Sequence, residues 1–204
     1  MRTPPFEQYF TNEEYRQRLE ALRSRIAQQG ADVMLVNTPE NLYYLTGYQT
    51  PGYYWYQTLI VPLDREPVFI ARSTESTNVD LLTWVEDSRP YVDFDDWIAR
   101  TTDALTDLGL DSKRIGLENR SFFITIDDYQ RLMAGLPSAT FVDCSGLVEE
   151  GRVTKSPQEL EYIRQAAKVA DAAMLAGIEA AAPGVTENEV AAEVHRAQIL
   201  AGGE

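Results

Sequence analysis

The chain has 204 residues, of which 44% are hydrophobic and 25% charged, ordinary values for a globular protein with a sizeable core. Its net charge of −14 argues against binding to nucleic acid or to an anionic membrane surface, because phosphate contacts need clustered lysines and arginines. Its single cysteine excludes an intrachain disulfide, and neither an apolar leader nor a run of membrane-spanning length occurs, so we expect a cytoplasmic protein.

Helix and strand signals alternate through the first part of the chain. A capping box begins at Thr11, and an apolar stripe at spacings of three and four residues follows it as far as Gly30. This pattern predicts one amphipathic helix. Residues 31–36 form a short apolar run that is typical of a buried strand. Residues 58–61 and 68–71 flank a turn and predict a β-hairpin.

The alternation continues to about residue 150. The further elements expected here are helices at about 75–85 and 95–108, a helix capped at Thr125, and strands at 114–118 and 140–143. The acid pairs Asp95–Asp96 and Asp127–Asp128 fall at helix starts, where the helix dipole favours negative charge. Helices and strands that intermix over residues 12–150 predict an α/β fold, a mixed β-sheet with flanking helices.

The character of the sequence changes after Arg152. Ser156 and Glu159 form a capping box, and a long apolar stripe follows as far as Ile178. A second capped helix begins at Thr186. Because an apolar stripe needs a surface to cover, these two helices are expected to be the start of an incomplete domain.

Aromatic residues crowd the stretch NLYYLTGYQTPGYYWY, residues 41–56, which holds six of the 11 tyrosines. A helical turn in its first part is expected to bury Leu42 and Leu45. Its second part, Tyr53, Tyr54, Trp55 and Tyr56, follows the turn signal at Pro51–Gly52 and leads into a strand. In a strand, alternate side chains point to opposite faces, so all four rings cannot enter one core.

No set of residues along the chain predicts a catalytic site. The one histidine, His195, lies on the last predicted helix, where a surface or capping role is favoured. Asp103, Asp107 and Asp111 are spaced by four and could hold a hard cation, but a solvated helix face is the preferred interpretation. Cys144 has no neighbouring base or cation to lower its pKa. Phosphate-binding glycine loops and nucleophile elbows are absent from the sequence.

Four segments, in this order, resemble the creatinase/prolidase/aminopeptidase P family of pita-bread metallohydrolases. They are NLYYLTGY at 41–48, RIGLE at 114–118, VTKSPQELEYIRQAA at 153–167 and PGVTENEV at 183–190. Each segment is weak by itself, but together they span nearly the whole chain at the family's spacing.

The resemblance implies a two-domain arrangement. Residues 1–152 would form the family's N-terminal domain, with a ribonuclease-H-like mixed sheet, and residues 153–204 the incomplete start of the catalytic pita-bread domain. The N-terminal domain is expected to take part in a homodimer. In metal-dependent members, two Asp, one His and two Glu hold two divalent ions (Mn, Co or Zn), whereas creatinase works without metal. None of the five ligands has a matching position here, so neither a catalytic residue, a metal ligand nor a bound cofactor is expected in this chain.

The resemblance also implies a function for the full-length protein, the hydrolysis of C–N bonds. An Xaa-Pro dipeptidase or aminopeptidase is the first expectation, and a creatinase- or ectoine-hydrolase-like enzyme is the alternative. A non-catalytic peptide- or protein-binding module is the second alternative, and an unrelated ligand-binding α/β domain the third. In dimeric relatives the loop after the first motif lies near the other subunit's active site. Tyr53, Tyr54, Trp55 and Tyr56 are therefore hypothesised to contact the substrate or the partner subunit.

Overall fold

The structure, a computed structural model, describes Pro4 and residues 8–203. These residues form two compact units, one ending at Val153 and the other beginning at Thr154. Within the described ranges, no helix combines the length and the apolar character needed to cross a bilayer. The expected absence of an apolar leader concerns the first ten residues, of which 1–3 and 5–7 lie outside the description.

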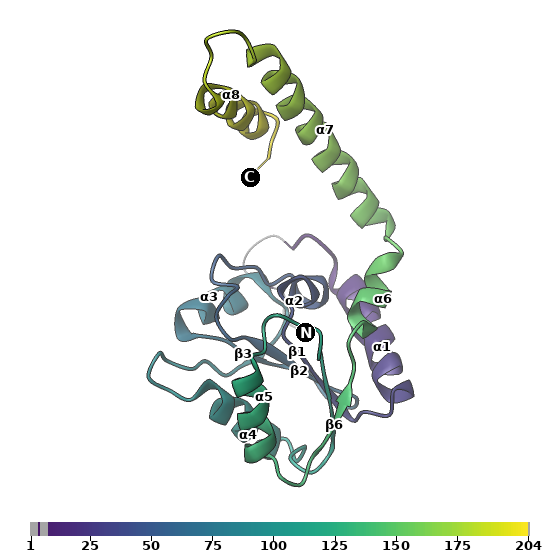
Figure 1. Cartoon of the computed structure of the whole chain (residues 1–204). Coiled ribbons are helices and arrows are strands. Elements are labelled where there is room, and N and C mark those ends of the chain that lie inside the picture. Colours follow the sequence, from purple (N-terminus) through teal and green to yellow (C-terminus); the bar gives the residue numbers. More distant parts are fainter. Residues whose placement is uncertain (1–3, 5–7, 204) are drawn as a thin grey trace. The chain divides into compact units, whose positions relative to one another are not determined.

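The first unit is built on a six-stranded mixed sheet with the order β4-β3-β2-β1-β5-β6 (Figure 1). In chain order the strands are β1 (Val33–Val36), β2 (Thr58–Pro62), β3 (Val68–Ile70), β4 (Asp87–Ser88), β5 (Arg114–Leu117) and β6 (Thr140–Asp143). Strand β1 pairs in parallel with β5, which pairs in parallel with β6, whereas β2 is antiparallel to both β1 and β3. The predicted mixed α/β fold and the predicted hairpin are confirmed.

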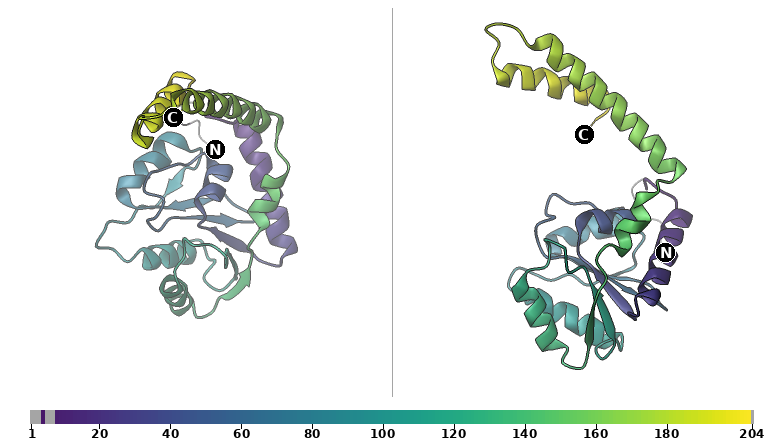
Figure 2. Two further views of the ribbon diagram at one scale, coloured as in Figure 1. Left: turned by 45° about the horizontal axis from the view of Figure 1, so that its top comes forward. Right: turned by 45° about the vertical axis from the view of Figure 1, so that its right-hand side comes forward.

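Helices cover both faces of this sheet (Figure 2). The helices of the unit are α1 (Asn12–Gln28), α2 (Pro39–Thr46), α3 (Ser73–Leu82), α4 (Trp97–Asp107), α5 (Ile126–Gly135) and α6 (Leu147–Val153). Helices α4 and α5 pack together on one face, and α1, α2 and α6 pack together on the other. The sheet is therefore the middle of three layers.

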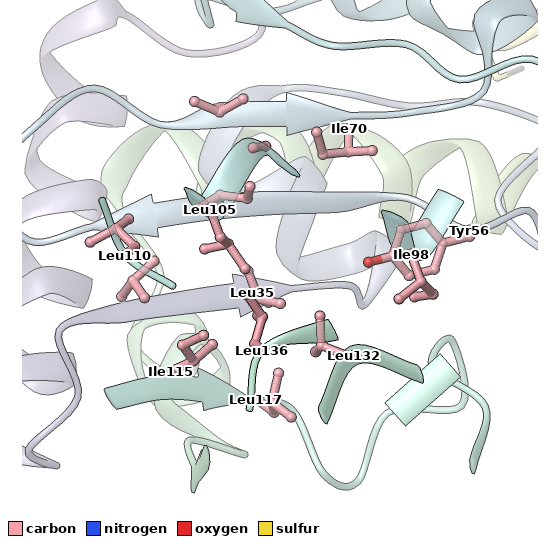
Figure 3. Packing of buried hydrophobic residues seen from close by; sticks show 14 of the residues in the cluster. Leu35, Tyr56, Ile70, Ile98, Leu105, Leu110, Ile115, Leu117, Leu132 and Leu136 are labelled. Atoms are coloured by element: carbon pink, nitrogen blue, oxygen red, sulfur yellow. The ribbon is translucent and has the colours of Figure 1, made fainter. Parts of the chain in front are cut away.

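Side-chain alternation along the strands separates the two cores. Leu35, Ile115 and Leu117 point toward α4 and α5, where they meet Leu105 and Leu132 in one cluster (Figure 3). The alternate residues of β1 point to the opposite face and are equally buried. Burial on both faces explains why residues 31–36 are apolar throughout and do not alternate with polar residues.

Local signals place most helix starts correctly. The side chains of Thr11, Thr125, Ser156 and Thr186 each accept a hydrogen bond from the backbone N–H three residues on, as their capping patterns predict. Two elements were not expected. Strand β4 has only two residues, and α6 has a glycine inside it and no capping pattern before it. Helix α3 lies about two residues earlier than predicted.

The second unit contains two helices, α7 (Pro157–Ala180) and α8 (Glu187–Leu200). They pack closely, since a Cβ added at Gly177 would lie 2.8 Å from Cγ2 of Val194. An apolar groove of about 940 Å³ runs along the pair. Large apolar side chains, among them Met174, Ile178 and Ile199, remain exposed. The pair by itself does not bury its apolar surface.

We expect the 204-residue chain to self-associate through this exposed surface, because contiguous apolar patches of this kind favour association in water. Light scattering at increasing concentration should show a mass above that of one chain. Replacing Met174 and Ile178 by lysine should lower the mass toward that of a monomer. Replacing Phe94, a fully exposed ring on the first unit, should leave it unchanged. A monomer at high concentration would contradict the expectation.

Candidate ligand pocket at the carboxyl edge of the sheet

One edge of the sheet gathers the loops that carry most of the exposed aromatic residues. Strands β1 and β5 run in parallel and both end at this edge, and the antiparallel β2 begins there, with Leu59 opposite Val36. The carboxyl edge of parallel strands is where open α/β sheets bind ligands. Residues 49–57 and 118–125 therefore lie where a site is expected.

The first of these loops follows α2, which ends at Thr46 and is capped by Gly47. That glycine has φ of 80°, and a Cβ there would lie 2.7 Å from the hydroxyl of Tyr15, so no other residue fits without strain. Leu42 and Leu45 of α2 are fully buried, which confirms the expected helical turn. The first part of the aromatic stretch is therefore mainly a packing element.

The second part of the stretch is a turn, and the alternating strand proposed for it is wrong. Residues 51–55 form a turn in which the N–H of Trp55 donates to the carbonyl of Gly52 at 3.0 Å. The turn signalled by Pro51–Gly52 thus continues as far as Trp55, and the β-propensity of the aromatic residues does not produce a strand there. Tyr53, Tyr54 and Trp55 are 51%, 68% and 39% exposed.

Tyr56, by contrast, is 8% exposed and belongs to the cluster between the sheet and α4 (Figure 3). Its hydroxyl lies 3.0 Å from Oγ1 of Thr101, and its carbonyl accepts from the hydroxyl of Tyr91 at 2.7 Å. Burial raises the pKa of Tyr56 to about 12. Its ring is thus held neutral and fixed, with the three exposed rings beside it.

A pocket of about 310 Å³ opens among these rings. Its walls come from residues 49–57 before β2 (the β2 loop), from the segment after β4, from the start of α4, and from the segment after β5 together with the first turn of α5. The lining residues are Tyr54, Trp55, Tyr56, Tyr91, Trp97, Phe122, Phe123, Thr125 and Asp128. Of the hypothesised contact residues, Tyr54, Trp55 and Tyr56 line it, whereas Tyr53 stacks edge-on against Phe123 outside the lining.

Sequence reasoning missed the remaining walls of the pocket. The pattern at about 95–108 predicts a helix that contains Trp97, and the sequence indicates for Asp128 only a favourable charge at a helix start. The aromatic pair Phe122–Phe123, directly after a strand and a turn, was the one available signal. This pair indicates a pocket only once the pairing of β5 with β1 is known.

Asp128 is the one carboxylate in the lining and is only 5% exposed. Its Oδ1 accepts from Nε1 of Trp97 at 2.7 Å, and its Oδ2 accepts from the N–H and the hydroxyl of Thr125 at 3.1 and 2.7 Å. The bond from the N–H of Thr125, together with the bond that the N–H of Asp128 donates to Oγ1 of Thr125 at 3.1 Å, forms the capping box of α5. Asp128 therefore fixes the helix start and the indole of Trp97 together.

Two arginines stand against the tryptophans of the pocket. The guanidinium of Arg72 lies 4.3 Å from the ring centre of Trp55, and that of Arg131 lies 5.4 Å from the ring of Trp97. Arg72 is ion-paired with Asp93, whose pKa is lowered by this hydrogen bond, and Arg131 is ion-paired with Asp96. Both positive charges are therefore already matched by a carboxylate.

A second polar cluster centres on Glu118, which directly follows β5. Glu118 is 3% exposed and accepts from the N–H groups of Asn37 and Thr38 at 2.7 and 2.8 Å and from Nδ2 of Asn41 at 2.6 Å. Asn41 in turn accepts from Arg152 at 2.8 Å. Burial raises the pKa of Glu118, against the effect of these donors. Both carboxylate oxygens of Glu118 are occupied by protein donors and Glu118 is not part of the pocket lining, so this cluster has a structural role.

Comparison with known proteins gives the family. The model of the creatinase/prolidase N-terminal domain matches residues 18–154, and this range contains the whole sheet and both polar clusters. The chain belongs to this family. The resemblance inferred from its sequence motifs is confirmed.

Members of the creatinase/prolidase family with known names match nearly the whole chain. It is 31% identical to the ectoine hydrolase of Halomonas elongata over 93% of its length and 29% identical to a creatinase of a Bacillus species over 89%. It covers 50% and 44% of those two proteins. The structure of the Xaa-Pro dipeptidase from Bacillus anthracis superposes with a TM-score of 0.76 at 22% identity, covering 92% of this chain and 50% of that one. The chain thus spans about half the length of the relatives it matches.

The remaining candidates from the sequence do not form a site in this family member. His195 is exposed on α8, and Asp107 is bound to Arg89 at 2.9 Å. Cys144 is buried, which raises the pKa of its thiol to about 11. Across Pro4 and residues 8–203, no three His, Cys, Asp or Glu side chains come together as metal ligands. These residues therefore do not fit a two-metal centre.

Proposed function

We propose that this chain is the N-terminal, non-catalytic part of a hydrolase that cleaves C–N bonds in a small molecule. The observation that carries the proposal is its match, over 93% of its length, to one half of an ectoine hydrolase. A small non-peptide molecule with a hydrolysable C–N bond is accordingly the first substrate class. An Xaa-Pro dipeptide is the second, favoured by the fold shared with the Xaa-Pro dipeptidase of known structure.

The test is an assay of the full-length protein with ectoine, creatine and a proline dipeptide, with and without a chelator. We expect hydrolysis of one of the three. Loss of activity with the chelator and its return with Mn²⁺ would place the protein with the metal-dependent members, and activity that survives the chelator with creatinase-like ones. A full-length protein that hydrolyses none of them but binds peptides would overturn the proposal in favour of a binding module.

We further propose that the exposed rings of the β2 loop form part of a substrate wall, or of the contact with the partner, in a homodimer. Tyr53 and Tyr54 are at least half exposed on a turn held in place by the fold, which suits a surface kept for contact. In the full-length enzyme, Tyr54→Ala should raise KM about three- to tenfold, because losing a well-packed ring contact costs about 1 kcal/mol. Phe94→Ala, which removes a fully exposed ring outside the loop, should not. Unchanged KM and unchanged dimer affinity in Tyr53→Ala and Tyr54→Ala would contradict this role.

The 204-residue chain alone is expected to have no hydrolase activity, even with added Mn²⁺, because its described part brings together no set of metal ligands. The three substrates used for the full-length protein should be incubated with the purified chain and Mn²⁺. Chelator-sensitive release of product would contradict the prediction.

A further inference from the structure

Among the described residues, the partners bonded to the buried carboxyl group of Asp128 are all neutral. Trp97 and Thr125 supply its three hydrogen bonds, all as donors, and this arrangement suits the ionised carboxylate, which can only accept. Within residues 4 and 8–203, no nitrogen of Lys, Arg or His lies close enough to it for an ion pair. A cation bound in the pocket that Asp128 lines would supply the positive charge that these bonded partners lack.

The rest of the pocket has the electrostatic character that attracts a cation. Trp55, Trp97, Tyr54, Phe122 and Phe123 surround the space that Asp128 lines, and the faces of aromatic rings carry partial negative charge. Arg72 and Arg131 already lie against two of these rings, which shows that the rings accept cations in this fold.

We propose that this pocket binds a small organic cation, a substituted ammonium ion, with Asp128 as its counter-charge. A metal ion would need several oxygen or nitrogen ligands, and the lining offers one carboxylate among rings. An alkylated ammonium ion is suited to both the carboxylate and the rings. It carries a positive charge, gives up its hydration readily and packs against aromatic faces. The volume of about 310 Å³ is at the small end for ligand pockets. The site lies within the first unit, so it does not depend on the proposed hydrolase function.

The test is a titration of the ¹⁵N-labelled 204-residue chain with choline at constant ionic strength. The indole N–H signals of Trp55 and Trp97 should shift together and saturate, with a Kd of about 1 mM. The signal of Trp84, which is buried and donates to the carbonyl of Leu45, should not move. The alcohol 3,3-dimethylbutan-1-ol has the same shape without the charge and should bind at least about tenfold more weakly.

Variants test the contributions of the carboxylate and of the aromatic rings separately. Asp128→Asn should weaken choline binding at least about tenfold while keeping the size of the side chain. Tyr54→Ala removes an exposed ring of the pocket without touching the helix cap and should also weaken it, whereas Phe94→Ala should not. If Asp128→Asn fails to fold, the comparison of choline binding by Tyr54→Ala and Phe94→Ala still tests the proposal. Equal affinity for choline and the alcohol, binding unchanged in a folded Asp128→Asn, or no saturable shift at all would overturn the proposal.

Discussion

Replacing Glu118 by alanine is expected to lower the free energy of unfolding by about 3 to 5 kcal/mol. The substitution leaves the buried N–H of Asn37 and the partly buried N–H of Thr38 without an acceptor, and it removes one of the two acceptors of the Asn41 amide. Each buried donor left unsatisfied costs about 1 to 3 kcal/mol. Urea unfolding followed by circular dichroism measures the loss.

A matched control comes from the same cluster. Glu149 also accepts from Nδ2 of Asn41, at 3.0 Å, but it is exposed, so Glu149→Ala should cost less than about 1 kcal/mol. Glu118→Gln should fall between the two, because its amide keeps an acceptor for the backbone N–H groups. The structural role assigned to Glu118 is refuted if its alanine variant is no less stable than Glu149→Ala.

The cost of Glu118→Ala should also depend on pH. Burial raises the pKa of Glu118 above its ordinary value of 4.5, so the folded chain holds this proton more tightly than the unfolded chain. Stability from this group is therefore greatest below the unfolded pKa and decreases as pH rises through the folded pKa. The difference between the wild type and Glu118→Ala should be larger at about pH 5 than at about pH 7.5. The opposite trend would mean that the hydrogen-bond donors outweigh burial.

Replacing Gly116 by alanine is the second large effect, an expected loss of about 1 to 3 kcal/mol. Gly116 lies in the middle of β5, and a Cβ there would stand 2.5 Å from Sγ of Cys144 and 3.4 Å from the carbonyl oxygen of Val33. The sulfur is buried against the sheet and cannot turn away into solvent. Thermal and urea unfolding of the variant measure the loss.

The clash is tested by a double-mutant cycle. Cys144→Ala removes the sulfur, so Gly116→Ala should cost at least about 1 kcal/mol less in that background than in the wild type. Residual strain is expected, because Cβ of residue 144 would still lie 3.2 Å from the added methyl. Strict additivity of the two substitutions would show that the sulfur is not the obstacle.

The sequence was most informative where the structure is local. The caps at Thr11, Thr125, Ser156 and Thr186 each depend on a contact three residues away, so the pattern contains both partners. The hairpin of β2 and β3 is similarly determined by a short turn between two apolar runs. The family resemblance added an expected order of domains, which no local pattern provides.

Contacts between distant segments were not predictable in this way. Asn41 and Glu118 belong to two separate motifs, and only the parallel pairing of β1 with β5 brings them within 2.6 Å. The pocket is a product of the same pairing, since Phe122 and Asp128 meet Trp55 across the sheet edge. The turn at residues 51–55 shows the complementary error, in which β-propensity was given more weight than the Pro–Gly signal before it.

Helix α6 determines where the first unit can be cut. Its carbonyl groups at Leu147 and Gly151 accept from Arg25 and Tyr44, both at 3.0 Å, and its Arg152 donates to Asn41. A chain shortened to residue 146 would lose all three bonds and uncover the apolar surface that Val148 fills. A chain ending at Val153 would keep them. The smallest piece able to fold independently therefore includes this helix, although no signal in the sequence before it announces a helix there.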